Sequence, residues 1–563
     1  MSHTVVRGQP TSSQLYLDTI LDEIIITEEG IEHKRKSRED VNLAEIIYYC
    51  MKKRIGEIFM INGSNGDRIT NGQVLKYAVP LARALQARNV KDRNIIIMMR
   101  NTEHMAFLYY AALFSGVVPL MIDSNSTVYE IRHFMDLAFP YIVFCDRDRV
   151  DNFKTAVKET NSSDLTIVIG DDIQCLKSFY DGHDDDVMSF CVSYASPDST
   201  ALLLPTSGTS GLAKATILDH NGLTAQLPVL WIHHADFPKP TEMALLLSSA
   251  QWMTHTILMT TCPVYGVKLL MTPQKPTVEH VLDIIEKIRP TWTLFGPTFA
   301  QTIAQRALSQ QLVSLQTVIL TGAPLTQSIA NILKERLPAS CYFGSGVGMT
   351  ETHGFFTMPG PKSAWDSNDK IMNTWFYKVI IFPQLIGDDG KESNKKGELL
   401  LKSSTCPFKG YYNNIQETRE AVSQDGWLLT GDVFYVVDFE EVYYVERKKL
   451  WFKYLNYHIS PVELENVINM VAGVQECVVC ETENGPAAAV VLRPGFSSDV
   501  KIKIHEAINS TLSDHKRLRG GIAFVSSLLY THSGKIKRAE CAMLIKNLAC
   551  SKKLKTIDCN YTM

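Results

Sequence analysis

A loop rich in glycine and hydroxyl groups, just before Lys214, carries the first side chains suited to chemistry. An apolar run at residues 201–204 predicts a buried strand that leads directly into this loop. The loop residues are Thr206, Ser207, Gly208, Thr209, Ser210 and Gly211. Glycines let the backbone approach an anion closely, and hydroxyl and N–H groups donate hydrogen bonds to phosphate oxygens. The loop therefore predicts a phosphate site, and an ordinary Ser/Gly surface turn is the alternative.

The lysine at the end of the loop does not belong to a Walker motif. A Walker loop needs Gly-Lys followed by Ser or Thr, whereas Lys214 lies between Ala213 and Ala215. Its compact positive charge still suits a phosphate group.

The composition is that of a globular protein with ample core. Of 563 residues, 45% are hydrophobic and 21% are charged, and the formal net charge is −4. Such a small charge provides no electrostatic basis for nucleic-acid binding. The 12 cysteines are scattered, and the one CxxC pair, Cys477 and Cys480, lies in a predicted strand. Residues three apart on a strand point to opposite faces, so we expect reduced cysteines and no shared metal.

Short apolar runs alternate with helical patterns before residue 320. The spacing predicts helices over residues 72–88 and 103–115. The predicted strands are residues 94–99, 117–121, 141–145, 165–169, 244–247, 268–271, 292–295 and 318–320. This alternation indicates βαβ units on largely parallel sheets, hence an α/β fold. The first forty residues are expected to be a peripheral lead-in.

The character of the chain changes after residue 395. Predicted strands then alternate with turns such as Asn413-Asn414 and Asp425-Gly426, which indicates a mainly β subdomain. From residue 446 helices and strands are mixed over a stretch long enough for a separate domain. We therefore predict two domains, residues 1–445 and residues 446–563.

The ends of the chain indicate no secretory or membrane targeting. Residues 1–7 lack the basic-then-apolar layout of a signal peptide, and no window reaches ~18 uncharged apolar residues. Residues 560–563 match neither an ER-retention nor a peroxisomal signal. A cytoplasmic protein is expected.

Five further motifs, taken with the glycine loop, resemble the adenylate-forming family of acyl-CoA synthetases, beetle luciferases and peptide-synthetase adenylation domains. They are Thr-Gly-Ala-Pro-Leu at 321–325, Gly-Val-Gly-Met-Thr-Glu-Thr at 346–352, Gly-Trp-Leu-Leu-Thr-Gly-Asp at 426–432, Tyr-Val-Glu-Arg-Lys-Lys at 444–449 with its continuation at 459–465, and Thr-His-Ser-Gly-Lys-Ile-Lys-Arg at 531–538. Each is weak alone, but all occur in the family's order and spacing. The chain looks most similar to insect luciferase-like acyl-CoA synthetases.

The resemblance implies a large N-terminal adenylation domain and a small mobile α+β C-terminal domain. In this family a carboxylate attacks the α-phosphate of ATP, and a thiol then converts the acyl-adenylate to a thioester. An acid–thiol ligase using ATP, Mg²⁺ and CoA is therefore expected, with a fatty or aromatic carboxylic acid as substrate. No obligate protein partner is expected, and the resemblance leaves a peroxisomal location open. Because two anions must meet, catalysis requires charge neutralisation and alignment.

The resemblance also assigns roles to individual residues. The loop at 206–211 with Lys214 would bind the β- and γ-phosphates, Thr350 the α-phosphate, and Glu351 Mg²⁺. Asp432 would accept the ribose hydroxyls, and Arg447 would reach the ribose or phosphates. The remaining nucleotide residues would be Gly322, Ala323 and Pro324 beside adenine, and Gly346, Val347, Gly348 and Met349. Lys535 would bridge the carboxylate and α-phosphate, and Lys449 would be the hinge. A surface ion pair or turn residue is the alternative for each taken alone.

Some positions depart from the family pattern. Val347 replaces an aromatic ring that would stack on adenine for ~1–3 kcal/mol, so weaker ATP binding is expected. Leu455 and Asn456 occupy a region after the hinge where a glycine is customary, which leaves the thioester step open.

The acyl-substrate residues are expected in and near the stretch 248–255. They are Trp252, Met253, His255 and His353. His255 replaces a small residue, and it either orients a polar substrate or is a hydrogen-bonded histidine of the pocket wall. Three functions remain open: a CoA ligase, luciferase-like oxygenation of the adenylate, and a binding paralogue that has lost turnover.

Overall fold

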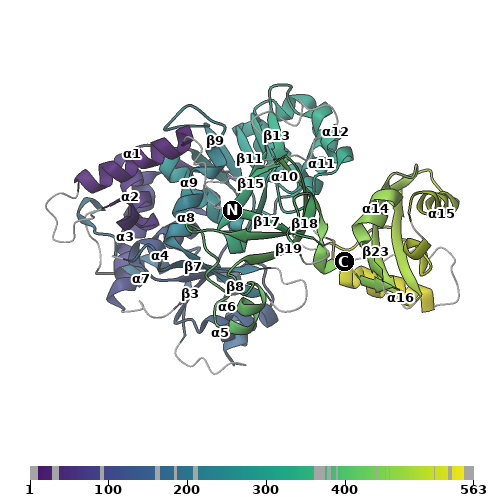
Figure 1. Cartoon of the computed structure of the whole chain (residues 1–563). Coiled ribbons are helices and arrows are strands. Elements are labelled where there is room, and N and C mark those ends of the chain that lie inside the picture. Colours follow the sequence, from purple (N-terminus) through teal and green to yellow (C-terminus); the bar gives the residue numbers. More distant parts are fainter. Residues whose placement is uncertain are drawn as a thin grey trace. The chain divides into compact units, whose positions relative to one another are not determined.

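The computed structural model describes most of the chain (Figure 1). The described residues are 10–27, 37–88, 94–158, 165–182, 187–193, 195–206, 213–359, 374–376, 382–387, 391–438, 441–450, 452–454, 457–482, 484–512, 514–530 and 536–550. The chain divides into two units. The first comprises Met1–Pro383, Leu400–Leu429 and Asp438–Val442, and the second comprises Gln384–Leu399, Thr430–Val437 and Tyr443–Met563.

A six-stranded sheet in the first unit positions the glycine loop. Its order is β6-β5-β3-β4-β7-β8, and every pair except the antiparallel β7–β8 hairpin is parallel. The strands are β3 (Ile95–Met98), β4 (Pro119–Met121), β5 (Ile142–Cys145), β6 (Thr166–Ile169), β7 (Thr200–Thr206) and β8 (Lys214–Asp219). The short apolar runs of the central strands are buried throughout, as expected for parallel strands covered on both faces.

A seven-stranded sheet in the same unit carries two of the nucleotide motifs at its strand ends. Its order is β13-β12-β11-β9-β10-β1-β2. The strands are β1 (Ile58–Asn62), β2 (Arg68–Thr70), β9 (Met243–Leu246), β10 (Lys268–Met271), β11 (Trp292–Phe295), β12 (Thr317–Leu320) and β13 (Tyr342–Ser345). Strands β12 and β13 are parallel neighbours, so the motifs that follow them, at 321–325 and 346–352, begin at the same edge.

The expected β-rich segment after residue 395 forms part of a third sheet. Its order is β14-β15-β16-β20-β19-β18-β17. The strands are β14 (Val347–Met349), β15 (Gly354–Pro359), β16 (Thr374–Phe376), β17 (Phe382–Ile386), β18 (Lys396–Lys402), β19 (Leu428–Asp438) and β20 (Glu441–Arg447). The predicted α/β class with a β subdomain is confirmed.

Helices of the first unit pack against these sheets. They are α1 (Ser12–Thr27), α2 (Leu43–Lys53), α3 (Asn71–Ala87), α4 (Glu103–Ser115), α5 (Val128–Ala138), α6 (Val150–Lys158), α7 (Ile173–Tyr180), α8 (His220–Gln226), α9 (Met253–Tyr265), α10 (Val278–Ile288), α11 (Pro297–Arg306), α12 (Gln327–Arg336) and α13 (Ile415–Glu420). Helices α4 and α9 are buried on nearly all sides, and the Tyr110 hydroxyl donates to the Met259 carbonyl 2.7 Å away. None of the helices in the described ranges is both long and apolar enough to cross a membrane.

The expectation of a peripheral lead-in is wrong for residues 12–27. They form α1, which lies beside α2 (Figure 1) and buries Leu17, Ile20, Leu21 and Ile24. These positions recur at helical spacing, so one face of α1 belongs to the core. The Tyr265 hydroxyl also donates to the Ser13 carbonyl, 3.0 Å away.

The second unit has an α+β tail, as expected. Its elements after β20 are β21 (Phe452–Tyr454), β22 (Tyr457–Ile459), α14 (Pro461–Asn469), β23 (Val474–Thr482), β24 (Gly485–Leu492), α15 (Val500–Thr511), β25 (Gly521–Phe524) and α16 (Arg538–Cys550). Cys477 packs in one hydrophobic cluster and Cys480 in another, on opposite faces of β23. The two thiols therefore belong to separate cores.

Candidate active site

Lys214 stands at the loop end of the β7–β8 hairpin, where the glycine loop joins the two strands. Thr206 is the last residue of β7 and pairs directly with Lys214, the first residue of β8. The hairpin thus brings the two ends of the glycine loop together. Ser207, Gly208, Thr209, Ser210 and Gly211 lie outside the described residues.

The ammonium group of Lys214 has an acidic and an aromatic neighbour. It forms an ion pair with Glu417 on α13 and lies 4.7 Å from the centre of the Tyr411 ring. The backbone of residues 410–412 runs along β8, since the Ile217 N–H donates to Gly410 and the Tyr412 N–H donates to Ala215. This pairing holds Tyr411 and the start of α13 next to the lysine.

The same tyrosine contacts Glu351. Thr350–Thr352 form a 3₁₀ turn directly after β14, and the Tyr411 hydroxyl donates to Glu351 Oε1 across 2.8 Å. Both Thr350 and Glu351 are half-buried. The structure therefore unites Lys214 and Glu351, which come from different motifs, at one site.

His353 is held in a buried polar network. It is fully buried in the left-handed backbone region (φ 58°), and its Nε2 lies 3.1 Å from Asp219 Oδ1. The other Asp219 oxygen is 2.8 Å from the Lys409 ammonium. Burial alone would raise the pKa of Asp219, but His353, Lys409 and the Gly222 N–H hold it below its usual value. The network ties the turn at 350–353 to the start of α8.

The adenine candidates follow adjacent strands. Gly322, Ala323 and Pro324 follow β12 after one intervening residue, and Gly322 has the positive φ of 85° that favours glycine. Gly346, Val347, Gly348 and Met349 come after β13, and the Gly346 N–H donates to Leu320 at the end of β12. Val347 is half-buried and Gly348 is exposed. The hydrogen bond brings the two motifs side by side.

Asp432 and Arg447 belong to the second unit and lie together there. Asp432 Oδ1 is 3.6 Å from Arg447 Nε, and the Asp432 side chain is 12% exposed. The Asp432 N–H donates to Thr430 Oγ1, whose hydroxyl donates to the Leu399 carbonyl. Lys449 is in a short 3₁₀ turn and its side chain is not described, while Lys535 lies outside the described residues.

The acyl-substrate candidates surround the start of α9. Trp252 is the N-cap residue and half-buried, Met253 is the first residue of the helix, and His255 is fully buried. Neither ring nitrogen of His255 has a hydrogen-bond partner within the described chain. The expectation that His255 is a hydrogen-bonded histidine of the pocket wall is therefore wrong there. Burial lowers the pKa of His255 to about 3, so its imidazole is neutral at pH 7.

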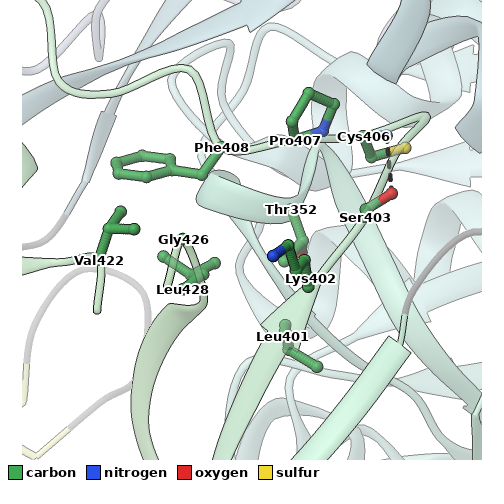
Figure 2. A pocket seen from close by; sticks show the side chains of 10 residues that line it. All are labelled: Thr352, Leu401, Lys402, Ser403, Cys406, Pro407, Phe408, Val422, Gly426 and Leu428. Carbon is green, nitrogen blue, oxygen red and sulfur yellow. Dashed lines mark hydrogen bonds between the residues drawn. The ribbon is translucent and has the colours of Figure 1, made fainter. Parts of the chain in front are cut away.

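A pocket of about 200 Å³ opens beside Thr352 (Figure 2). It is lined by Thr352, Leu401, Lys402, Ser403, Cys406, Pro407, Phe408, Val422, Gly426 and Leu428. Lys402 already donates to the Asp425 carbonyl, and Cys406 Sγ donates to the Gly222 carbonyl. These polar groups are internally satisfied, so the pocket is an adjacent hollow without evident chemistry.

Sequence reasoning missed Tyr411, Glu417 and Asp219. No motif or spacing distinguishes them from ordinary loop and cap residues. The sequence offered only that they are acidic or phenolic residues, some of them close to predicted turns.

The model of the AMP-binding enzyme family matches residues 50–412, and that of the AMP-binding enzyme C-terminal domain matches residues 463–535. The chain is 26% identical over 535 residues to a luciferin 4-monooxygenase of Photuris pensylvanica, covering 89% of this chain and 94% of the relative. It is 26% identical over 495 residues to 4-coumarate-CoA ligase-like 9 of Arabidopsis thaliana, covering 86% of each. ATP-bound MatB from Rhodopseudomonas palustris shares the fold, with a TM-score of 0.77 at 20% identity over 90% of this chain and 100% of MatB.

Proposed function

The chain belongs to the AMP-binding enzyme family, and from that membership we propose that it activates a carboxylic acid with ATP and transfers the acyl group to CoA. The acid is a medium- to long-chain fatty acid or an aromatic acid. One structural observation supports the proposal most strongly. Lys214, a cation suited to phosphate, and Glu351, an anion suited to Mg²⁺, both contact the side chain of Tyr411.

The first step joins two anions. A carboxylate oxygen attacks the α-phosphorus, and the bond from that phosphorus to the pyrophosphate oxygen breaks. Lys214 neutralises the departing pyrophosphate, and Thr350 donates a hydrogen bond to the α-phosphate. Lys535 and Arg447 supply further positive charge, and Asp432 accepts hydrogen bonds from the ribose hydroxyls.

The residues present fit Mg²⁺, which adenylate formation requires. Glu351 is a half-buried carboxylate, and within the described chain only its Oε1 has a hydrogen-bond partner. Its Oε2 is therefore available to a hard cation, which prefers carboxylate and phosphate oxygens. The bound ion would neutralise phosphate charge.

The second step requires a thiol. We propose that residues 446–563 move about Lys449 between the two steps, and that Trp252, Met253, His255 and His353 contribute to the acid site. Luciferase-like oxygenation of the adenylate is the second candidate, because the first relative above is a luciferin 4-monooxygenase. Light emission with luciferin and oxygen would favour it.

A panel of fatty and aromatic acids tests the proposal. Pyrophosphate release is measured with each acid and MgATP, and mass spectrometry follows the CoA thioester. We expect acid-dependent pyrophosphate release and a thioester with at least one acid. Absence of both across the panel would leave the non-catalytic paralogue as the better description.

Replacing Val347 by tyrosine is expected to lower the KM for ATP by about fivefold, because an aromatic ring stacked on adenine contributes ~1–3 kcal/mol. Val347 is half-buried in the motif that follows β13, where we propose that the added ring would stack on the base. Steady-state kinetics with Val347→Leu as the apolar control measures the effect. An unchanged or higher KM would show that the base does not pack there.

A further inference from the structure

Tyr411 contacts both charged side chains of the candidate site, although no motif includes it. Its hydroxyl donates to Glu351 Oε1 at 2.8 Å, and its ring centre lies 4.7 Å from Lys214 Nζ. We propose that Tyr411 is a positioning residue that presets the Glu351 carboxylate for the cation and confines the Lys214 ammonium. This inference rests on the proposed function, since it assigns a nucleotide–metal site to these two residues.

The backbone around Tyr411 is fixed from two directions. On one side it forms a β-bridge to Thr216 of β8. On the other, its N–H donates to Thr418 Oγ1 of α13 at 2.8 Å. The Phe408 ring packs against the Tyr411 ring edge-on, with centres 5.1 Å apart. A side chain anchored in this way can impose its position on a more flexible glutamate.

The next residue provides a built-in comparison. Successive side chains of an extended segment point to opposite faces. Accordingly Tyr412 turns away from the charged pair, packs against the core of the six-stranded sheet, and accepts a hydrogen bond from Asn94 at 2.7 Å. Tyr411 lies in the β-bridge and Tyr412 at the start of the turn that follows, and of the two only Tyr411 contacts Glu351 and Lys214.

The hydrogen bond from Tyr411 reduces the freedom of Glu351. A glutamate side chain loses rotamer entropy when it binds an ion, and a partner that holds one oxygen beforehand removes part of that cost. With Oε1 held, Oε2 would remain available to a cation. The ring of Tyr411 favours a nearby ammonium by cation–π attraction, which restricts Lys214 as well.

The test compares Tyr411→Phe with Tyr412→Phe. Binding of Mn²⁺, used as the spectroscopic substitute for Mg²⁺, is titrated in the presence of ATP by electron paramagnetic resonance, without the acid. We expect Tyr411→Phe to weaken Mn²⁺ binding about tenfold, since a hydrogen bond to a charged group is lost. Tyr412→Phe should bind Mn²⁺ like the parent and instead lower the melting temperature. Tyr411→Leu should additionally weaken ATP binding, because the ring beside Lys214 is gone.

The inference would be overturned if both phenylalanine variants bound Mn²⁺ as tightly as the parent. It would also be overturned if both lost Mn²⁺ affinity to the same extent. Pyrophosphate release by the parent protein is measured in parallel. If the parent is active and Tyr411→Phe binds Mn²⁺ normally, the positioning role alone is wrong. If the parent releases no pyrophosphate with any acid, the proposed function fails, and that result is recognised independently of the metal titration.

Discussion

Glu351→Gln is expected to slow pyrophosphate release about 100-fold or more, because removing one preorganised electrostatic group costs a factor of ~10²–10³. Glutamine has nearly the same shape and can still accept the hydrogen bond from the Tyr411 hydroxyl. It lacks the negative charge that a hard cation requires. The change therefore removes the proposed metal ligand and should leave the local structure intact. Single-turnover release with saturating MgATP and a competent acid measures the effect.

Glu420→Gln is the matched control for this variant. Glu420 lies on α13, is exposed, and accepts a hydrogen bond from Gln416 one turn earlier. Its neutralisation changes the net charge equally without affecting the site, so its rate should equal that of the parent. If Glu351→Gln released pyrophosphate at the control rate, the cation would have to be held by other residues.

His255→Leu is expected to stabilise the first unit by about 1–3 kcal/mol at pH 7.5, since a buried unsatisfied polar group costs about that much. His255 is fully buried, and both ring nitrogens lack partners within the described chain. Leucine fills most of the same space without polar atoms. The free energy of unfolding of the first unit, from urea or thermal denaturation of the variant and the parent, measures the difference.

The same substitution should change the pH dependence of stability. Burial lowers the pKa of His255 from 6.5 to about 3 in the folded chain. As the pH falls through 6.5, the unfolded chain binds a proton that the folded chain does not, so the parent loses ~1.4 kcal/mol per pH unit until the folded pKa is reached. Above pH 6.5 both states are neutral and the contribution is constant. His255→Leu should lack this loss between pH 6.5 and pH 4.

His255→Gln separates the two effects. Glutamine does not titrate, so this variant should share the flatter pH response of His255→Leu, but it stays polar and should not share the stabilisation. A less stable His255→Leu at pH 7.5 would mean that the ring has a hydrogen-bond partner, and the structural assignment of His255 would be wrong.

Local sequence patterns were sufficient for most elements of the fold. The helical spacing at 72–88 corresponds to α3, and the apolar runs at 141–145 and 292–295 correspond to β5 and β11. The β subdomain and the opposite orientations of Cys477 and Cys480 were also predictable, because strand periodicity is a local property. The α1 helix was missed although its apolar spacing is helical, since its mixed composition concealed the buried face.

Family membership likewise followed from the sequence alone, because ordered motifs are read along the chain. The charged network of the site did not follow from it. Lys214 and Glu417 are 203 residues apart, and Tyr411 and Glu351 are 60 apart. Their contact depends on the register in which residues 410–412 pair with β8, which no local pattern encodes.

The amino-acid sequence alone was thus enough to predict most strands and helices and the motifs shared with adenylate-forming enzymes. Only the tertiary structure decided that Tyr411 lies between a lysine and a glutamate, that His353 is tied to Asp219, and that His255 is buried without a partner. The physical reason is that periodicity and turn chemistry act over a few residues. Burial and hydrogen-bond pairing are instead set by how distant strands and helices pack together.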